Sequence, residues 1–74
     1  MDVKKIIAAY LAGEAAAVNL QIGDVFTGAF GAAKEHGHDD ATQSIFTSGY
    51  LDGLHRFAPG GVVTDQDGRI TEFL

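Results

Sequence analysis

The residues most able to do chemistry lie in one segment, positions 35–40, where two histidines and three carboxylates occur within six positions. Imidazole and carboxylate groups are ligand types for zinc and other divalent ions, so His36, His38, Asp39 and Asp40 are candidate metal ligands. The same segment also suits a helix boundary, because its glycine can end one helix and an aspartate can cap the next. We favour this structural interpretation and keep a metal-binding protein as an alternative.

Other catalytic patterns do not occur in the sequence. There is no cysteine, which excludes thiolate catalysis, cysteine-based metal sites and disulfides. A glycine-rich phosphate loop ending in Lys-Ser or Lys-Thr, a Gly-x-Ser-x-Gly elbow and a His-Glu-x-x-His helix are also missing. A chain of 74 residues leaves little room for a substrate cleft. We therefore predict that the protein is not an enzyme and needs no cofactor.

The formal net charge is −5, and the acidic excess lies in the C-terminal half. Up to position 34 three acids balance three lysines, whereas seven acids face two arginines after it. Clustered Lys and Arg supply most of the affinity for a phosphate backbone, so direct nucleic-acid binding is disfavoured and a basic protein is the expected partner. The candidate partner-binding residues on this acidic face are Asp39, Asp40, Asp52, Asp65 and Asp67.

The hydrophobic spacing predicts a mainly α fold, a single small three-helix domain over residues 1–74 with a short C-terminal β-hairpin. An amphipathic helix over 3–18 follows a capping Asp2, a second helix covers about 24–36, and a third covers about 41–57. Pro59 precedes a hairpin over about 62–73, whose turn is rich in Asp and Gly. The break between the first two helices stays open: it falls at Gly13 or near 19–23, or a single helix runs on from about Glu14. The apolar stripe of the first helix consists of Val3, Ile6, Ile7, Tyr10, Leu11, Ala15 and Val18.

Two similar stretches, residues 25–30 and 45–50, each place two aromatic side chains four positions apart. On a helix such pairs share a face, which predicts that the second and third helices form a hairpin around a common core. Gly49 and Gly53 cut a groove into the third helix, and we expect it to receive the second helix around Gly28 or the same groove of a second copy. The residues expected in packing and self-association are Phe26, Gly28, Phe30, Phe46, Gly49, Tyr50 and Gly53.

These observations lead to one functional hypothesis and two alternatives. A chain this short without disulfides is near the lower limit of a stable core, so we expect a homodimer or an obligate protein partner. The longest uncharged run is too short for a bilayer and the N-terminus has no clear signal-cleavage site, which favours a cytoplasmic protein without membrane contact. We expect an acidic interaction module that inhibits or adapts a larger protein, such as a basic, nucleic-acid-handling one. The alternatives are the metal-binding protein and a nucleic-acid-binding three-helix domain.

Overall fold

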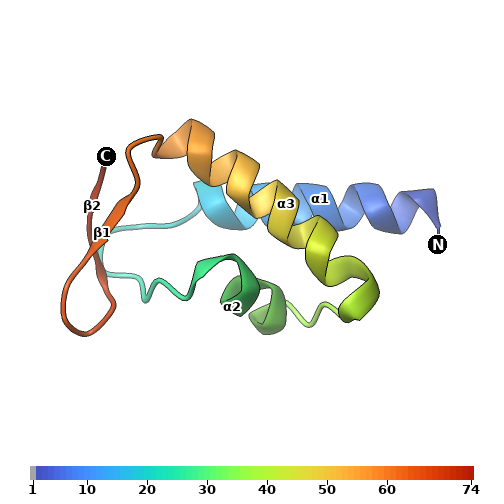
Figure 1. Cartoon of the computed structure of the whole chain (residues 1–74), viewed down its shortest axis with the longest axis horizontal. Helices are drawn as coiled ribbons and strands as arrows, with labels where there is room; N and C mark the ends of the chain where they lie inside the picture. Colours follow the sequence, from blue (N-terminus) through green and yellow to red (C-terminus); the bar gives the residue numbers. More distant parts are fainter. Residues whose placement is uncertain (1) are drawn as a thin grey trace.

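A computed structural model describes residues 2–74, which form three helices followed by an antiparallel two-stranded hairpin (Figure 1). This arrangement confirms the predicted mainly α fold with a short C-terminal hairpin. The elements are α1 (Val3–Val18), α2 (Gly28–Glu35), α3 (Asp40–Phe57), β1 (Val62–Thr64) and β2 (Ile70–Phe73). None of the helices in this described part combines the length and the apolar character needed to cross a bilayer.

Two aspartates cap the N-termini of the long helices. The side chain of Asp2 accepts a hydrogen bond from the Lys4 backbone N–H at 3.0 Å, and Asp39 accepts one from the Thr42 backbone N–H at 3.0 Å. Each carboxylate satisfies a backbone donor that has no partner within its helix. The cap of α3 is therefore Asp39, and Asp40 is the first residue of the helix.

Helices α1 and α3 lie against each other, and α2 packs on the pair (Figure 1). Glycines make the α1–α3 contact close. A Cβ atom added to Gly13 would overlap the Phe46 carbonyl oxygen, and one added to Gly49 would overlap the Tyr10 carbonyl oxygen. The groove of α3 is thus filled by α1, so the predicted occupants, the second helix around Gly28 and the groove of a second copy, are wrong.

The second helix begins four residues later than predicted, and the alternative of one continuous helix from about Glu14 is also wrong. Residues 24–27 are not helical, because their backbone pairs with the hairpin, which is distant in the sequence. Val25 forms an isolated antiparallel bridge with Arg69, and the Phe26 N–H donates to the Gly68 carbonyl at 2.9 Å. The helix starts at Gly28, whose φ of 77° only glycine adopts readily.

The C-terminal hairpin is attached at its turn end to the extended segment before α2 and at its open end to Phe57 of α3. Its register pairs Val62 with Phe73, and the Asp65 side chain closes the turn by accepting backbone N–H bonds from residues 67 and 69. Ile70 is buried, and the Phe57 and Phe73 rings meet with their centres 4.8 Å apart. An isolated hairpin would be marginal in water, so these contacts hold it in place.

The core lies where the three helices meet. Phe46 and Tyr50 of α3 are buried there against three alanines of the other two helices, Ala17, Ala32 and Ala33. The expectation that all four aromatics of the repeated stretches are buried is only half correct. Phe30 is 62% exposed, and Phe26 is partly buried but lies in the extended segment before α2. The reason is the late start of α2, which removes Phe26 from the helix and leaves the two aromatics of this stretch on different structural elements.

Candidate interaction surface

The two histidines of the candidate metal segment pack on an aromatic ring. The His36 and His38 ring centres lie 5.3 and 4.6 Å from that of Phe46, and His38 Nδ1 is 3.0 Å from Thr42 Oγ1. Within residues 2–74 no three His, Asp or Glu side chains are gathered to hold a metal ion. The segment lies at the predicted helix boundary, between the end of α2 at Glu35 and the Asp39 cap of α3. Both imidazoles lie against the buried Phe46 ring.

The predicted acidic face is not one surface. Asp39 and Asp40 lie at the start of α3, Asp52 lies near its C-terminal end, and Asp65 and Asp67 lie in the hairpin turn at the opposite end of the molecule (Figure 1). Three of the five carboxylates have intramolecular bonds: Asp39 caps α3, Asp65 closes the turn, and Asp52 accepts a bond from Tyr10. The prediction grouped these residues because they lie in the same half of the sequence, whereas α3 separates them in space.

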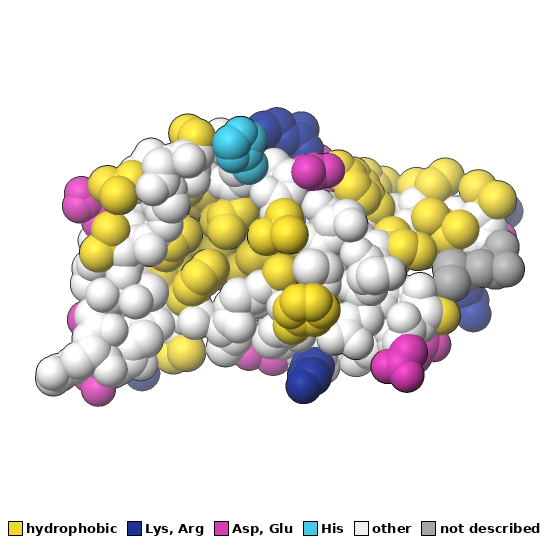
Figure 2. Space-filling view, in the orientation of Figure 1, with side chains coloured by type: hydrophobic (Ala, Val, Ile, Leu, Met, Phe, Trp, Pro, Cys, Tyr) yellow, Lys and Arg dark blue, Asp and Glu magenta, His cyan; other side chains and the backbone are white. Residues whose placement is uncertain are grey.

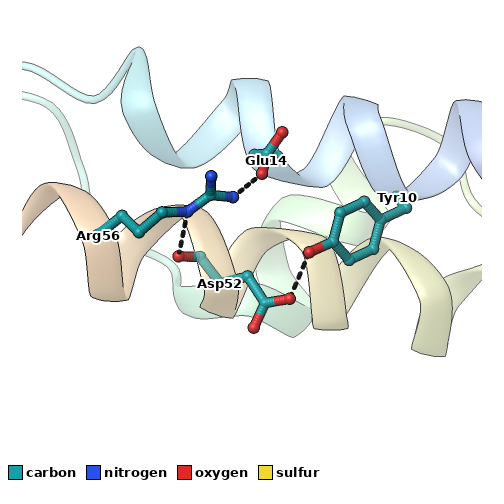
Figure 3. Close-up of polar contacts among 4 residues, drawn as sticks. All are labelled: Tyr10, Glu14, Asp52 and Arg56. Atoms are coloured by element: carbon teal, nitrogen blue, oxygen red, sulfur yellow. Dashed lines mark hydrogen bonds and ion pairs between the residues drawn. The ribbon is translucent and has the colours of Figure 1, made fainter.

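Four polar side chains connect α1 with α3 on the surface (Figure 3). The Tyr10 hydroxyl donates to an Asp52 carboxylate oxygen, and the Arg56 guanidinium forms an ion pair with Glu14. Arg56 Nε also lies 3.5 Å from the Asp52 carbonyl oxygen. The bond to Asp52 raises the pKa of Tyr10, because a carboxylate acceptor favours the protonated phenol. These contacts fix the relative position of the two helices, and they neutralise Glu14.

The side of α1 that faces away from α3 carries large apolar side chains. We call the set Val3, Ile7, Leu11 and Val18 the α1 outer face. These residues are 66%, 53%, 53% and 46% exposed. Their spacing of four, four and seven positions places them on one side of the helix. Figure 2 shows hydrophobic side chains on the surface at the N-terminal end of this helix. The apolar stripe predicted for the first helix is thus largely on the surface.

Small residues occupy the buried side of α1 instead. Ala9, Gly13 and Ala17 follow one another at intervals of four positions and are buried. They allow the backbone of α3 to approach, which larger side chains would prevent. Sequence reasoning missed this second stripe, although its signal was present as three small residues at helical spacing, because it gave weight to the large apolar residues.

Charged residues lie next to the α1 outer face, and Lys4, seven positions before Leu11, lies on the same side of the helix at its N-terminal end. A surface hollow of about 390 Å³ beside the α1 outer face is lined by Leu11, Glu14, Ala15, Val18 and Arg56, so the ion pair of Glu14 forms part of its wall. The last turn of α1 contains no basic residue and its first turn no acidic one, whereas Lys4 lies in the first turn. The negative end of α1 therefore has no compensating basic side chain, whereas the Asp2 carboxylate caps its positive end.

A second apolar hollow lies at the C-terminal end of α3. It has a volume of about 500 Å³, and residues on its wall include Leu51, Leu54, His55 and Pro59. Leu51 is 53% exposed, the same fraction as Leu11 of the α1 outer face. This equality makes Leu51 a matched control position for substitutions at Leu11.

Comparison with protein-family models, curated proteins and solved structures found no match.

Proposed function

We propose that this protein is a non-enzymatic protein–protein interaction module whose docking surface is the α1 outer face. The observation that carries the proposal is the row of half-exposed large aliphatic side chains on one side of a 16-residue helix. Single exposed hydrophobic residues are common on proteins, whereas a continuous row of them is typical of an interaction site. An apolar helix face is a surface that another helix can cover through anchors at three- and four-residue spacing.

The proposal includes a larger protein partner with a basic surface, toward which the module acts as an inhibitor or adaptor. The net charge of −5 supports electrostatic attraction to such a surface. Asp40 and Asp67 lie at opposite ends of the molecule and contribute to this long-range attraction rather than to one contact. Within residues 2–74 neither carboxylate takes part in a hydrogen bond or an ion pair, unlike those of Asp39, Asp52 and Asp65.

The proposed function is tested by affinity capture from the native cell lysate with three baits: the unchanged protein, Leu11→Glu and Leu51→Glu. We expect at least one protein other than the chain itself to bind the unchanged protein and Leu51→Glu, and to be lost from Leu11→Glu. Added salt and an Asp40→Lys, Asp67→Lys double variant are expected to weaken the same interaction. If all three baits retain the same proteins, the α1 outer face is not the docking surface.

The charge reversal avoids Asp39 for a structural reason. Its carboxylate caps α3 through the Thr42 backbone N–H, so a lysine there would disturb the helix as well as the surface charge. Asp40 and Asp67 are exposed and make no side-chain bond, so their replacement breaks no contact. A lysine in the first turn of α3 costs about 0.3–1 kcal/mol through the helix dipole, and circular dichroism therefore checks that the double variant retains its helix content.

A further inference from the structure

We propose that the α1 outer face binds the same face of a second copy of the chain, with the two α1 helices antiparallel and Leu11 at the twofold axis. This inference rests on the proposed function, because it concerns the same docking surface: a second copy covers the α1 outer face in the isolated protein, and the larger partner displaces that copy when it binds. A twofold contact requires a patch that is complementary to itself. Three properties of α1 meet this requirement: the placement of its apolar residues, its local charge and the uncompensated negative end of its helix dipole.

The apolar residues are distributed nearly symmetrically about Leu11. Val3 lies eight positions before Leu11, and Val18 lies seven positions after it. In an antiparallel pair centred on Leu11, Val3 of one copy meets the region of Val18 of the other, and Ile7 meets the region of Ala15. Apolar side chains therefore face apolar side chains around Leu11 and Ile7, whereas Lys4, seven positions before Leu11 and so on the same side of the helix, meets the region of Val18.

The local charge of α1 permits two acidic copies to meet. The segment from Asp2 to Val18 contains two acids, Asp2 and Glu14, and two lysines, so its formal charge is zero although each chain carries −5. Glu14 borders the outer face, but the Arg56 guanidinium neutralises it. The remaining acidic residues lie outside this helix, so the segment itself adds no net charge repulsion between two copies.

The helix dipole selects the antiparallel orientation. Lys4 lies at the positive end of α1, where a cation is unfavourable, and the negative end has no basic residue of its own. An antiparallel second copy brings Lys4 close to the last turn of the other α1, near Val18. Each copy thus places a cation at the negative end of the other copy's helix. A parallel pair would instead place Lys4 beside Lys4 of the other copy.

A second copy also adds the apolar burial that this small chain lacks. Its largest fully buried side chains are Tyr50, Phe46 and Ile70, and its remaining core contacts depend mostly on alanines. The contact of two single helices is small compared with stable dimer interfaces, so we expect a reversible dimer whose population rises with protein concentration.

Sedimentation velocity over a range of concentrations tests the dimer. We expect the mass to rise from the monomer value of 7.8 kDa toward twice that value for the unchanged protein and for Leu51→Glu. Leu11→Glu is expected to stay monomeric, with circular dichroism confirming that its helix content is retained. A monomer at every concentration overturns the inference, and so does a dimer that Leu11→Glu leaves intact.

Cysteine cross-linking tests the orientation, because the natural chain has no cysteine. Under mild oxidation Leu11→Cys is expected to form a disulfide-linked dimer. Val18→Cys alone is expected to stay unlinked, whereas a mixture of Val3→Cys and Val18→Cys chains is expected to link to each other. Efficient linking of Val18→Cys to itself would overturn the antiparallel arrangement.

The two proposals can fail separately. If the unchanged protein is monomeric but another protein is captured through Leu11, the second copy is wrong and the docking surface stands. If the dimer forms through Leu11 and no other protein is captured in a Leu11-dependent manner, the dimer stands and the interaction with a larger protein is wrong.

Discussion

Replacement of Gly49 by alanine is the most direct perturbation of the contact that organises this fold. Gly49 faces the backbone of α1, and an added Cβ atom would overlap the Tyr10 carbonyl oxygen and lie 2.9 Å from its carbonyl carbon. Backbone atoms cannot rotate away as a side chain does. The methyl group can be accommodated only if α1 moves outward from α3, which opens the packing around Phe46 and Tyr50.

Two opposite effects determine the size of the change in stability. Alanine is favoured over glycine inside a helix by about 1 kcal/mol, so helix propensity alone predicts a more stable protein. Overpacking of a close contact typically costs about 1–3 kcal/mol and occasionally more, and the overlap with a backbone carbonyl places Gly49→Ala at the upper end. We expect a net loss of about 2 kcal/mol or more, out of the total of roughly 4–11 kcal/mol that is typical for a domain of this length.

The assay is urea unfolding followed by circular dichroism at one fixed protein concentration, because self-association would make stability depend on concentration. Gly53→Ala supplies a graded comparison: its Cβ atom would lie 2.8 Å from the Glu14 carbonyl oxygen, so a smaller shift relieves the contact and we expect a loss of less than about 1 kcal/mol. Ser48→Ala, on the exposed side of α3, is expected to change stability by less than about 0.5 kcal/mol. If Gly49→Ala is more stable than the unchanged protein, the close α1–α3 crossing is refuted.

Three further predictions follow from burial and ionisation. Phe46→Ala is expected to destabilise the protein by about 3–5 kcal/mol and Phe30→Ala by less than about 0.5 kcal/mol in urea unfolding, and similar losses would contradict the different burial of the two rings. The Thr42 backbone N–H lowers the pKa of Asp39, so the contribution of this carboxylate to folding stability is present above the ordinary Asp pKa and is lost as pH falls through the lowered pKa. The stability difference between the unchanged protein and Asp39→Ala should therefore shrink in acid. A difference that stays constant would disprove the charged cap. Burial raises the pKa of Tyr50, so the contribution of the neutral phenol to folding stability is complete below the ordinary Tyr pKa of about 10 and is lost as pH rises through the raised pKa. Thermal unfolding should show that Tyr50→Phe loses less stability in alkali than the unchanged protein. Equal losses would argue against this role of Tyr50.

Much of the fold could be predicted because its signals are local. These signals act within a few residues of the chain, and each has its expected role in the structure. They are the capping aspartates, the glycine after α2 and the Asp-rich turn before Arg69. The start of α2 could not be predicted in the same way. Residues 24–27 have helical spacing, but pairing of Val25 and Phe26 with residues 68–69 keeps their backbone extended. That pairing joins segments more than forty positions apart, so no local pattern reveals it.

The exposed apolar face of α1 was harder to predict because this helix carries two stripes at helical spacing. The large residues and the small residues Ala9, Gly13 and Ala17 both satisfy the period of a helix. Periodicity identifies a helix and its faces, but it does not decide which face packs on the core. The decisive fact is the shape of α3, where Gly49 and Gly53 admit a backbone and leave no space for side chains such as Leu11.

The close helix contact and the exposed apolar row are two consequences of one arrangement. Because α3 presents glycines to α1, the facing side of α1 has to be small, and its large apolar residues lie on the outer side. If burial within a single chain were their only role, the exposed leucine, isoleucine and valines could be polar without loss. Their exposure at regular spacing, on a segment from Asp2 to Val18 whose formal charge is zero, is the physical basis of the proposed association through α1.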